Sequence, residues 1–434
     1  MNQDIKLQDI IISLVHSIDM MSSFIHRHHL RVAILAEAIA DEAGWDKHKK
    51  RRLILAAVMH DIGAVSSAEK NELTQMDVKE DHQHAALGAG MLCDFPYFID
   101  IVPVILYHHH YWHNGKGSYA GTDLVPEESF LLHLADRIDI SIDPATWILD
   151  QTEKIRIQIK SLAGEVFKPE LVEAFLRCSV HDAFWLRLDG CSMENLLHRT
   201  LSHEPALIVD TDMLEALART FSHIIDFRSK FTATHSAGVA AVAYSLAQLN
   251  GYPDEKCRKI RIAGYLHDIG KIAVPSEILN KPDKLTEKEF NRMKAHAFYT
   301  NSILSELQVL ADICAWASSH HEKLDGSGYP FGLDNHSLSE ESRIMTYADV
   351  LTALREDRPY RKSMPIDDSL AAIVAMLQPS ENDHIYKLLT GHIAEIDTAR
   401  AIAQQDAADK YQKITLLRYK YKVKLEVNYI KDFC

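Results

Sequence analysis

The feature that most constrains this chain is an ordered set of histidines and aspartates that occurs twice. In each half, a first histidine precedes a histidine-aspartate pair by 32 residues, a later histidine precedes a histidine doublet by 24, and a final aspartate follows the doublet by 27 or 28. The seven positions of the first half are His28, His60, Asp61, His84, His108, His109 and Asp136. Those of the second half are His235, His267, Asp268, His296, His320, His321 and Asp349. This self-similarity indicates two copies of one module.

Local signals predict that each module is helical. Apolar residues follow His235 at helical spacing up to a C-terminal cap at Gly251. Thr286 and Glu289 match a capping box, which places a ligand histidine in the third turn of the helix that follows. Ser339 is the predicted N-cap of the helix that carries the last aspartate. With only 17 glycines and 13 prolines in 434 residues, the composition also favours long helices.

We expect two tandem helical domains and a short extension. The first domain is predicted over residues 1–203, the second over 204–401, and a basic amphipathic extension over 402–434. Tyr419–Val427 alternates apolar and charged residues, which predicts a small C-terminal strand or hairpin that covers its own domain.

Composition excludes several classes of protein. The formal charge of -14 argues against a nucleic-acid polymer as partner, because such proteins neutralise phosphates with lysine and arginine. No apolar run reaches the roughly 18 residues of a membrane span, and the N-terminus lacks the pattern of a signal peptide. The six cysteines are scattered without a C-x-x-C pair, so a cysteine metal site is not indicated. We therefore expect a cytoplasmic protein.

Five histidines and two aspartates in each module suit a site for two transition metals. Imidazole binds several divalent metals well, and seven ligands exceed what one ion takes. A carboxylate has two oxygens, so Asp268 is the natural bridge between ions about 3.5 to 4 Å apart. Such a pair activates water and neutralises charge on a phosphorus centre, which favours phosphoester hydrolysis. A lone histidine would more often be a core residue, but the repeated order argues for ligation.

The second half resembles an HD-GYP domain, a bacterial subgroup of the HD metal-dependent phosphohydrolases. The resemblance covers about residues 210–400 and is carried by LHDIGK at 266–271, HHEKLDGSGYP at 320–330 and DRPYRK at 357–362. It implies an all-α fold with two tandem HD-type domains. It also implies hydrolysis of a cyclic dinucleotide, typically cyclic di-GMP, to linear pGpG and often to GMP, in second-messenger signalling that controls biofilm and motility.

The resemblance assigns roles to the residues of the second module. One ion would take His235, His267 and Asp349, the other His296, His320 and His321, with Asp268 shared. Iron or manganese is the expected metal, and nickel, cobalt or zinc are alternatives. Among partners, the loop of the GYP motif would meet a GGDEF-type or other signalling protein, and a homodimer is a further option.

The remaining candidates follow from position. Lys271 stands four residues after His267, hence on the same face if the helix continues, where its ammonium would contact the scissile phosphate. Arg358 and Arg361 would grip the non-reacting phosphate as a fork, and Glu322 would orient a histidine ligand. Gly326, Tyr329 and Pro330 belong to the loop that we expect to shape the entrance of the site and to contact the substrate.

The second module departs from the family pattern at three places. Phe231 stands where members with a third metal carry glutamate, so two ions are expected. His296 is followed by Ala-Phe-Tyr-Thr instead of the usual proline and later glycine, so the local backbone shape is in doubt. Thr352, three residues after Asp349, stands where aspartate is common. None of the three removes a predicted ligand.

The first module keeps the ligand set but loses other parts. Ala64 replaces the lysine, His110 replaces the glutamate, YWHNGKGSY replaces the GYP loop, and no RPYR motif follows Asp136. We expect a regulatory or dimerising module. The alternative is a second hydrolase, a 5′-nucleotidase that removes the terminal phosphate of the linear product.

Three other functions stay open for the whole chain. The first is a phosphodiesterase specific for 3′3′-cGAMP, since base preference leaves no spacing signature. The second is a hydrolase of nucleotide mono- or polyphosphates, which would tolerate loss of Arg358 and Arg361. The third is a nucleotide sensor without turnover, against which the intact ligand set and Lys271 argue.

Overall fold

The computed structural model describes residues 7, 9–13, 27–64, 83–121, 123–190, 192–201, 208–228, 233–307, 310–357 and 361–422. Phe231, Arg358 and residues 423–434 lie outside the described residues. The described part is helical apart from one antiparallel hairpin, so the expected all-α class is confirmed. No described helix is long and apolar enough to cross a membrane.

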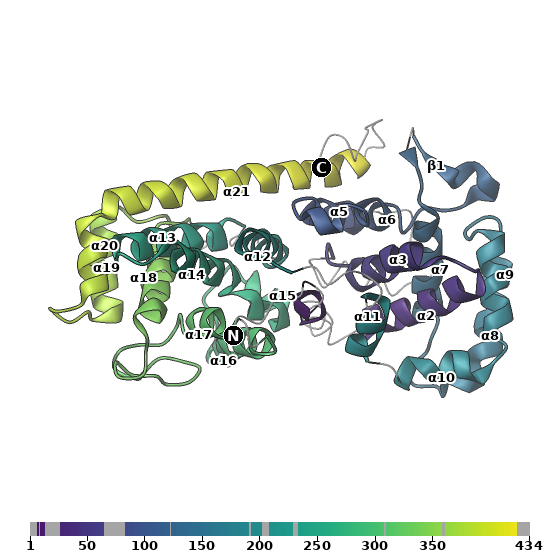
Figure 1. Cartoon of the computed structure of the whole chain (residues 1–434), viewed down its shortest axis with the longest axis horizontal. Helices are drawn as coiled ribbons and strands as arrows, with labels where there is room; N and C mark the ends of the chain where they lie inside the picture. The colour runs from purple at the N-terminus through teal and green to yellow at the C-terminus, as the bar shows by residue number, and fades with distance from the viewer. Residues whose placement is uncertain are drawn as a thin grey trace. The chain divides into compact units, whose positions relative to one another are not determined.

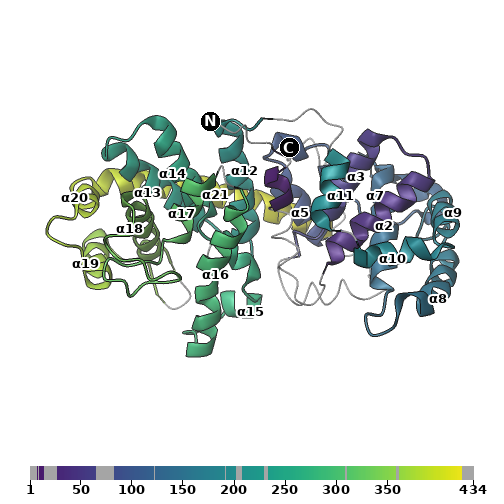
Figure 2. The same ribbon diagram turned by 60° about the horizontal axis from the view of Figure 1, so that its bottom comes forward.

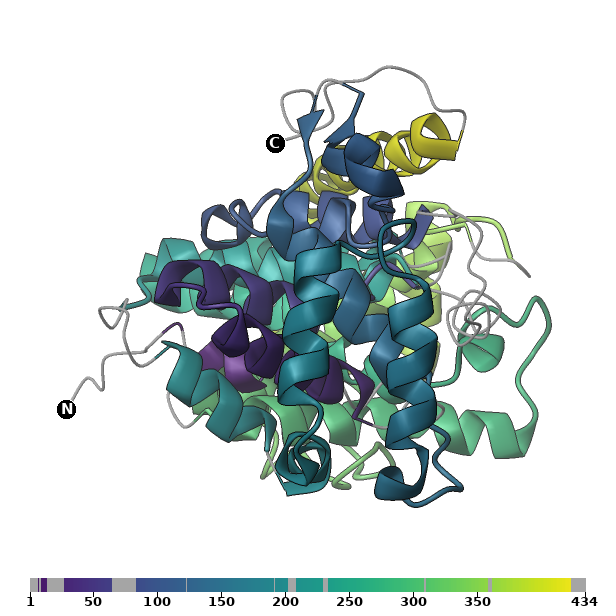
Figure 3. The same ribbon diagram turned by 90° about the vertical axis from the view of Figure 1, so that its right-hand side faces the viewer.

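The elements of the first half begin with α2 (Figure 1). They are α2 (His28–Glu42), α3 (Lys47–Met59), α5 (Gln83–Leu92), η1 (Pro96–Phe98), α6 (Val102–Leu106), η2 (His113–Ser118), β1 (Tyr119–Ala120), β2 (Asp123–Leu124), α7 (Glu127–Ile140), α8 (Ile148–Ser161), α9 (Pro169–Cys178), α10 (Asp182–Gly190) and α11 (Met193–Leu201). Helices α8 and α9 contact each other and stand at the front of the view in Figure 3.

The elements of the second half begin with α12. They are α12 (Thr211–Asp226), α13 (His235–Leu249), α14 (Asp254–Leu266), η3 (Ile269–Ala273), α15 (Ser276–Leu279), α16 (Glu287–Ser305), α17 (Ala311–Ser318), α18 (Glu340–Leu354), α19 (Ile366–Leu377), α20 (His384–Gly391) and α21 (Ile393–Lys422).

The chain forms two compact units. One unit holds residues 14–207 and 413–434, and the other holds residues 1–13 and 208–412. The junction after residue 207 is close to the predicted boundary, but the described residues 7 and 9–13 belong to the second unit instead of the first. There the buried Leu7, Ile10 and Ile11 add apolar surface, and the Ser13 hydroxyl donates to the carbonyl of Ile303 at 2.9 Å.

Both units repeat one helix arrangement. In the first, α2 contacts α3 and α7, α5 contacts α6, and α3 contacts α6. In the second, α13 contacts α14 and α18, α16 contacts α17, and α14 contacts α17 in the same way (Figure 1 and Figure 2). The predicted internal repeat is therefore also a repeat in three dimensions.

Local capping chemistry places the helices that carry the histidines and aspartates. The Thr286 side chain accepts from the amide of Glu289, and Glu289 accepts in return, which completes the predicted capping box of α16. Ser339 caps α18 by accepting from the amide of Ser342 at 3.2 Å. Helix α13 ends at Leu249, followed by Gly251 with a left-handed φ of 78°.

The predicted C-terminal strand is wrong for the residues that the structure describes. Residues 419–422 continue α21, which begins at Ile393. The stretch before them is rich in alanine, glutamine and lysine, and extending an existing helix costs far less than nucleating a new element. Propagation of the helix therefore prevails over the alternating pattern.

Two glycines set how closely the helices approach at the two clusters. Gly63 and Gly270 each stand two residues after the aspartate of the histidine-aspartate pair. A Cβ on Gly63 would lie 2.1 Å from the carbonyl oxygen of His84, and one on Gly270 would lie 1.9 Å from that of His296. Each position leaves room only for hydrogen, because main-chain atoms cannot yield as a flexible side chain does.

We predict that Gly270→Ala lowers the free energy of unfolding of the second unit by about 2 kcal/mol or more, because η3 must move away from α16. Differential scanning calorimetry of the full chain measures the change. Gly391→Ala is the control, since nothing lies within 4 Å of its Cβ position and alanine favours a helix by about 0.5 to 1 kcal/mol. Equal melting temperatures of the two variants would contradict the prediction.

Candidate metal centre

The seven predicted ligands of the second unit meet between its helices. His235 begins α13, His267 and Asp268 follow α14, and Asp349 lies in α18. The ligand atoms of His296, His320 and His321 lie within 4.8 Å of one another, as do those of His235, His267 and Asp268. Asp349 faces both groups, with Oδ1 at 3.1 Å from His235 Nε2 and Oδ2 at 3.7 Å from His321 Nδ1.

The carboxylate of Asp268 lies between the two histidine groups. Its Oδ2 is 3.2 Å from His267 Nε2, and its Oδ1 is 3.5 Å from His296 Nε2. One oxygen therefore faces each group, which is the arrangement that a carboxylate shared by two ions requires.

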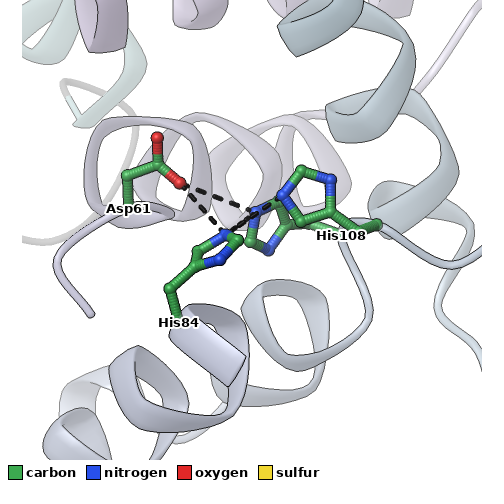
Figure 4. Close-up of side chains that lie close together, drawn as sticks. Asp61, His84 and His108 are labelled. Atoms are coloured by element: carbon green, nitrogen blue, oxygen red, sulfur yellow. Dashed lines mark hydrogen bonds and ion pairs between the residues drawn. The ribbon is translucent and has the colours of Figure 1, made fainter. Parts of the chain in front are cut away.

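The first unit builds the same arrangement around Asp61. Figure 4 shows Asp61, His84 and His108 pointing toward one another, with Asp61 Oδ1 at 3.4 Å and 3.8 Å from the two imidazoles. The other oxygen, Oδ2, lies 3.3 Å from His60 and 3.7 Å from His28. His109 joins the Oδ1 group, and Asp136 joins His28 and His60. All seven predicted positions of the first module are thus brought together.

Main-chain carbonyls fix the tautomer of the central histidines. Each of five imidazoles lies with Nδ1 at 2.6 to 2.8 Å from the carbonyl oxygen three residues earlier. These five are His60, His108, His267, His296 and His320. Because a carbonyl only accepts, Nδ1 carries the proton and the Nε2 lone pair faces the cluster. Neutral imidazoles oriented in this way are what a metal binds.

Burial keeps several of these groups in the charge state that metal binding needs. Burial lowers the pKa of His296 to about 3, and the charges of His321 and Lys271 add to this. Burial also lowers the pKa of His320 well below its ordinary value. For Asp268 burial alone would raise the pKa, but His267 and Lys271 hold it well below its usual range. Near neutral pH, His296 and His320 are therefore neutral and Asp268 is ionised.

Unsatisfied buried atoms test whether metals fit these residues. Among the described residues, His60 Nε2 and His267 Nε2 are buried without a hydrogen-bond partner, as are Asp61 Oδ1 and Asp136 Oδ1. Unsatisfied buried polar atoms cost about 1 to 3 kcal/mol each, so they call for a ligand. Imidazole nitrogens and carboxylate oxygens are donors that divalent transition metals accept. The residues of both clusters therefore fit metal ions.

Lys271 reaches the cluster by a different route from the one predicted. Helix α14 ends at Leu266, so no continuous helix joins His267 to Lys271. Lys271 lies in the 3₁₀ turn η3, and its Nζ is 2.5 Å from Asp268 Oδ2. In a 3₁₀ turn residues three apart eclipse one another, and this aligns the ammonium with the carboxylate.

Glu322 holds the loop after the histidine doublet. Its buried carboxylate accepts from the backbone amides of Phe331, Gly332 and Leu333 at 2.7 to 3.2 Å. These contacts differ from the predicted role of orienting a histidine. A Cβ on Gly328 would lie 2.4 Å from Glu322 Cα, so the loop folds back closely on the residue that anchors it.

The other predicted substrate residues lie around this loop. Gly326 has a left-handed φ of 74°, and Pro330 follows Tyr329 through a cis peptide bond. The ring of Tyr329 lies 4.8 Å from that of His321, which brings the loop to the cluster. Arg361 donates to the carbonyls of Leu354 and Ala353 at the end of α18, so its role in binding a phosphate stays a prediction.

In each module one further carboxylate contacts the first histidine, and the sequence analysis predicted neither contact. Asp139 Oδ2 lies 2.7 Å from His28 Nδ1, and Glu356 Oε2 lies 3.1 Å from His235 Nδ1. Burial would lower the pKa of His28, but its hydrogen bonds to Asp136 and Asp139 raise it to about 10. Helical spacing could have found Asp139, which stands three residues after Asp136 within α7, but not Glu356, which lies past the end of α18.

The polar surroundings of the two clusters differ. In the first unit Ala64 stands in place of the lysine, and the buried Arg137 donates to Asp136 Oδ2 at 2.5 Å. The second unit instead has its cationic group, Lys271, on the central aspartate. A fixed positive charge is therefore present at both clusters but on different aspartates.

Comparisons with known proteins agree with this architecture. Two family models, each described as an HD domain, match residues 25–141 and 219–383. A crystal structure of a cyclic GMP-AMP-specific phosphodiesterase from Vibrio cholerae superposes with a TM-score of 0.57 over 90% of this chain and 98% of that chain. At 24% identity this match shows the fold alone.

Curated relatives include two phosphodiesterases with different named substrates. The 3′3′-cGAMP-specific phosphodiesterase 1 of Vibrio cholerae is 29% identical over 84% of this chain and 86% of its own length. The cyclic di-GMP phosphodiesterase response regulator RpfG of Xanthomonas campestris is 39% identical over 42% of this chain, which spans half of that relative. With an HD domain and a histidine-aspartate cluster in each half, the chain belongs to the HD superfamily.

Proposed function

We propose that the second module is a metal-dependent phosphodiesterase that hydrolyses a cyclic dinucleotide. Cyclic di-GMP, cut to linear pGpG and onward to GMP, is the main candidate substrate, and 3′3′-cGAMP is the alternative. The observation that carries the proposal is Asp268, whose two oxygens face two separate histidine groups. Relatives named for each substrate support the class without favouring either base.

The metals would be held by the ligands described above. His235, His267 and Asp349 would take one ion, the histidines at 296, 320 and 321 the other, and Asp268 both. When bound, the pair supplies an activated water and neutralises charge on the phosphorus centre. We propose iron or manganese as the metal.

Lys271 and the entrance loop would complete the chemistry. The Lys271 ammonium lies beside Asp268, where it can contact the scissile phosphate and protonate the ribose 3′ oxygen as the P–O bond breaks. The product then carries a 5′-phosphate. Tyr329 against His321 limits the space beside the reacting group, and Arg358 with Arg361 would bind the second phosphate.

In the cell we propose that the enzyme lowers a cyclic-dinucleotide second messenger in the bacterial cytoplasm, with effects on biofilm and motility. The loop held by Glu322 is the proposed contact for a GGDEF-type or other signalling protein, and a homodimer is proposed as the assembly. If a chain that lacks this loop co-elutes with the signalling protein as the parent chain does, the proposed partner contact is contradicted.

The substrate is tested with anaerobically purified, metal-analysed protein and both cyclic dinucleotides. We expect a linear product from at least one of them, and His267→Ala with Asp268→Ala should abolish both metal loading and turnover. Product chromatography is the measurement. Two bound metals with turnover of neither substrate would contradict the proposal and favour a nucleotide phosphohydrolase or a sensor.

Lys271→Ala should keep the metals and slow hydrolysis by about 10² to 10³-fold, as expected when one electrostatic group is lost. Metal analysis and kcat under saturating substrate separate the two effects. Lys259→Ala, on the partly exposed face of α14, is the matched control and should leave the rate unchanged. An unchanged rate for the Lys271 variant would refute the assignment.

For the first module we propose metal binding, supported by Asp61, whose oxygens face two histidine groups. A regulatory or dimerising role remains the leading proposal, because Ala64 and the changed loop remove groups that would hold a cyclic dinucleotide. The competing role is a 5′-nucleotidase acting on the linear product.

His60→Ala with Asp61→Ala decides between these roles of the first module. If the module is regulatory, the ratio of linear dinucleotide to mononucleotides and inorganic phosphate should stay unchanged while activity or assembly shifts. Chromatography with phosphate analysis follows the products. Accumulation of the linear product with loss of free phosphate would instead support the nucleotidase.

A further inference from the structure

The two modules orient their first histidine with carboxylates from different positions. In the first, Asp139 lies three residues after the ligand Asp136, and its Oδ2 is 2.7 Å from His28 Nδ1. Arg31, one turn after His28, donates to the same carboxylate at 2.6 Å. This set is local, since all of it comes from α2 and α7.

The second module has neither the acid nor the arginine of that set. The residue three after Asp349 is Thr352, and the residue three after His235 is Gly238. Thr352 is buried, and its hydroxyl has no hydrogen-bond partner among the described residues. The position that contacts the histidine in the first module therefore makes no such contact here.

Glu356 occupies the missing contact from one helical turn further on. It stands seven residues after Asp349, just past the end of α18 at Leu354, and its Oε2 lies 3.1 Å from His235 Nδ1. Because it lies beyond the helix, Glu356 reaches His235 from the segment after α18, whereas Asp139 reaches His28 from within α7. Glu356 is buried, so water does not compete strongly for this contact.

Helix α21 holds the other oxygen of Glu356. The Gln404 amide donates to Glu356 Oε1 and accepts from the Arg400 guanidinium. Arg400 also donates to Asp397 at 2.7 Å, and Arg355 donates to that carboxylate at 2.8 Å. The orientation of Glu356 thus depends on a chain of hydrogen bonds that begins on α21.

Gly238 makes the space for this arrangement. A Cβ at Gly238 would lie 2.8 Å from Gln404 Nε2 and 2.8 Å from Thr352 Cγ2. The slot that holds Arg31 in the first module is therefore filled by Gln404 from a helix distant in sequence. The three exchanges at 238, 352 and 356 are parts of one rearrangement.

We propose that Glu356 is the positioning residue for His235, in place of the carboxylate that the first module carries at Asp139, and that α21 fixes it through Gln404. His235 donates its Nδ1 proton to Glu356, which leaves the Nε2 lone pair for a metal. The inference rests on the proposed metal site and concerns the part of it that includes His235.

The test is Co²⁺ binding to the full chain carrying His60→Ala and Asp61→Ala, so that only the second module reports. Glu356→Ala should weaken Co²⁺ binding by about 10 to 100-fold and change the visible absorption spectrum of the bound ion. Adding Thr352→Asp should restore both, because position 352 matches the carboxylate position of the first module. Glu341→Ala, on the same helix, is the control and should bind as the parent does.

Each result decides a separate point. Unchanged Co²⁺ affinity and spectrum in Glu356→Ala overturn the inference, as does failure of Thr352→Asp to restore them. If metal-free Glu356→Ala melts far below the parent chain, Gln404→Leu is measured in its place. Co²⁺ affinity equal to that of the parent in Gln404→Leu would overturn the role of α21. A parent chain that binds no Co²⁺ contradicts the proposed function itself.

Discussion

Both clusters depend on hydrogen bonds between imidazoles and the open ends of helices. The last carbonyls of a helix have no partner within it. His60 and His267 follow directly after α3 and α14. His60 donates its Nδ1–H to the carbonyl of Ala57, and His267 donates its own to the carbonyl of Gly264. A single bond thus satisfies the helix end, selects the tautomer and aims Nε2 at the centre. The helix ends therefore orient the predicted ligands from outside the cluster.

The duplicated module separates what metal binding needs from what substrate binding needs. Both copies share the seven clustered histidines and aspartates, the position of Asp61 or Asp268 between two histidine groups, and a closely packed glycine two residues later. Lys271 and the loop anchored by Glu322 belong to the second copy alone. The features shared by both copies depend on close packing, and a packed core tolerates little change in side-chain volume. The unshared set contacts the cluster through the carboxylate of Asp268 and the ring of His321.

Much of the site was predictable because it depends on ordered polar residues at fixed spacing. The ligands, the helix caps at Thr286 and Ser339, and the repeat itself all leave such a signal. The contacts of Glu356 with Gln404 join residues far apart in sequence, so no local pattern predicts them. The strand predicted at residues 419–422 failed because alternation is a weak signal beside a helix already in progress. Lys271 lies beside Asp268, but it does so through a 3₁₀ turn that the helical spacing did not predict.

The anchoring of the loop by Glu322 has a consequence for selectivity. Glu322 adjoins His321, and its carboxylate, fully buried, holds three consecutive amides of the opposite strand of the loop. Lifting this segment would leave a buried carboxyl group without its three amide donors, which is costly. The loop is therefore held at three consecutive amides beside the histidine doublet. A substrate of the proposed class would therefore meet a loop whose shape Glu322 has already set.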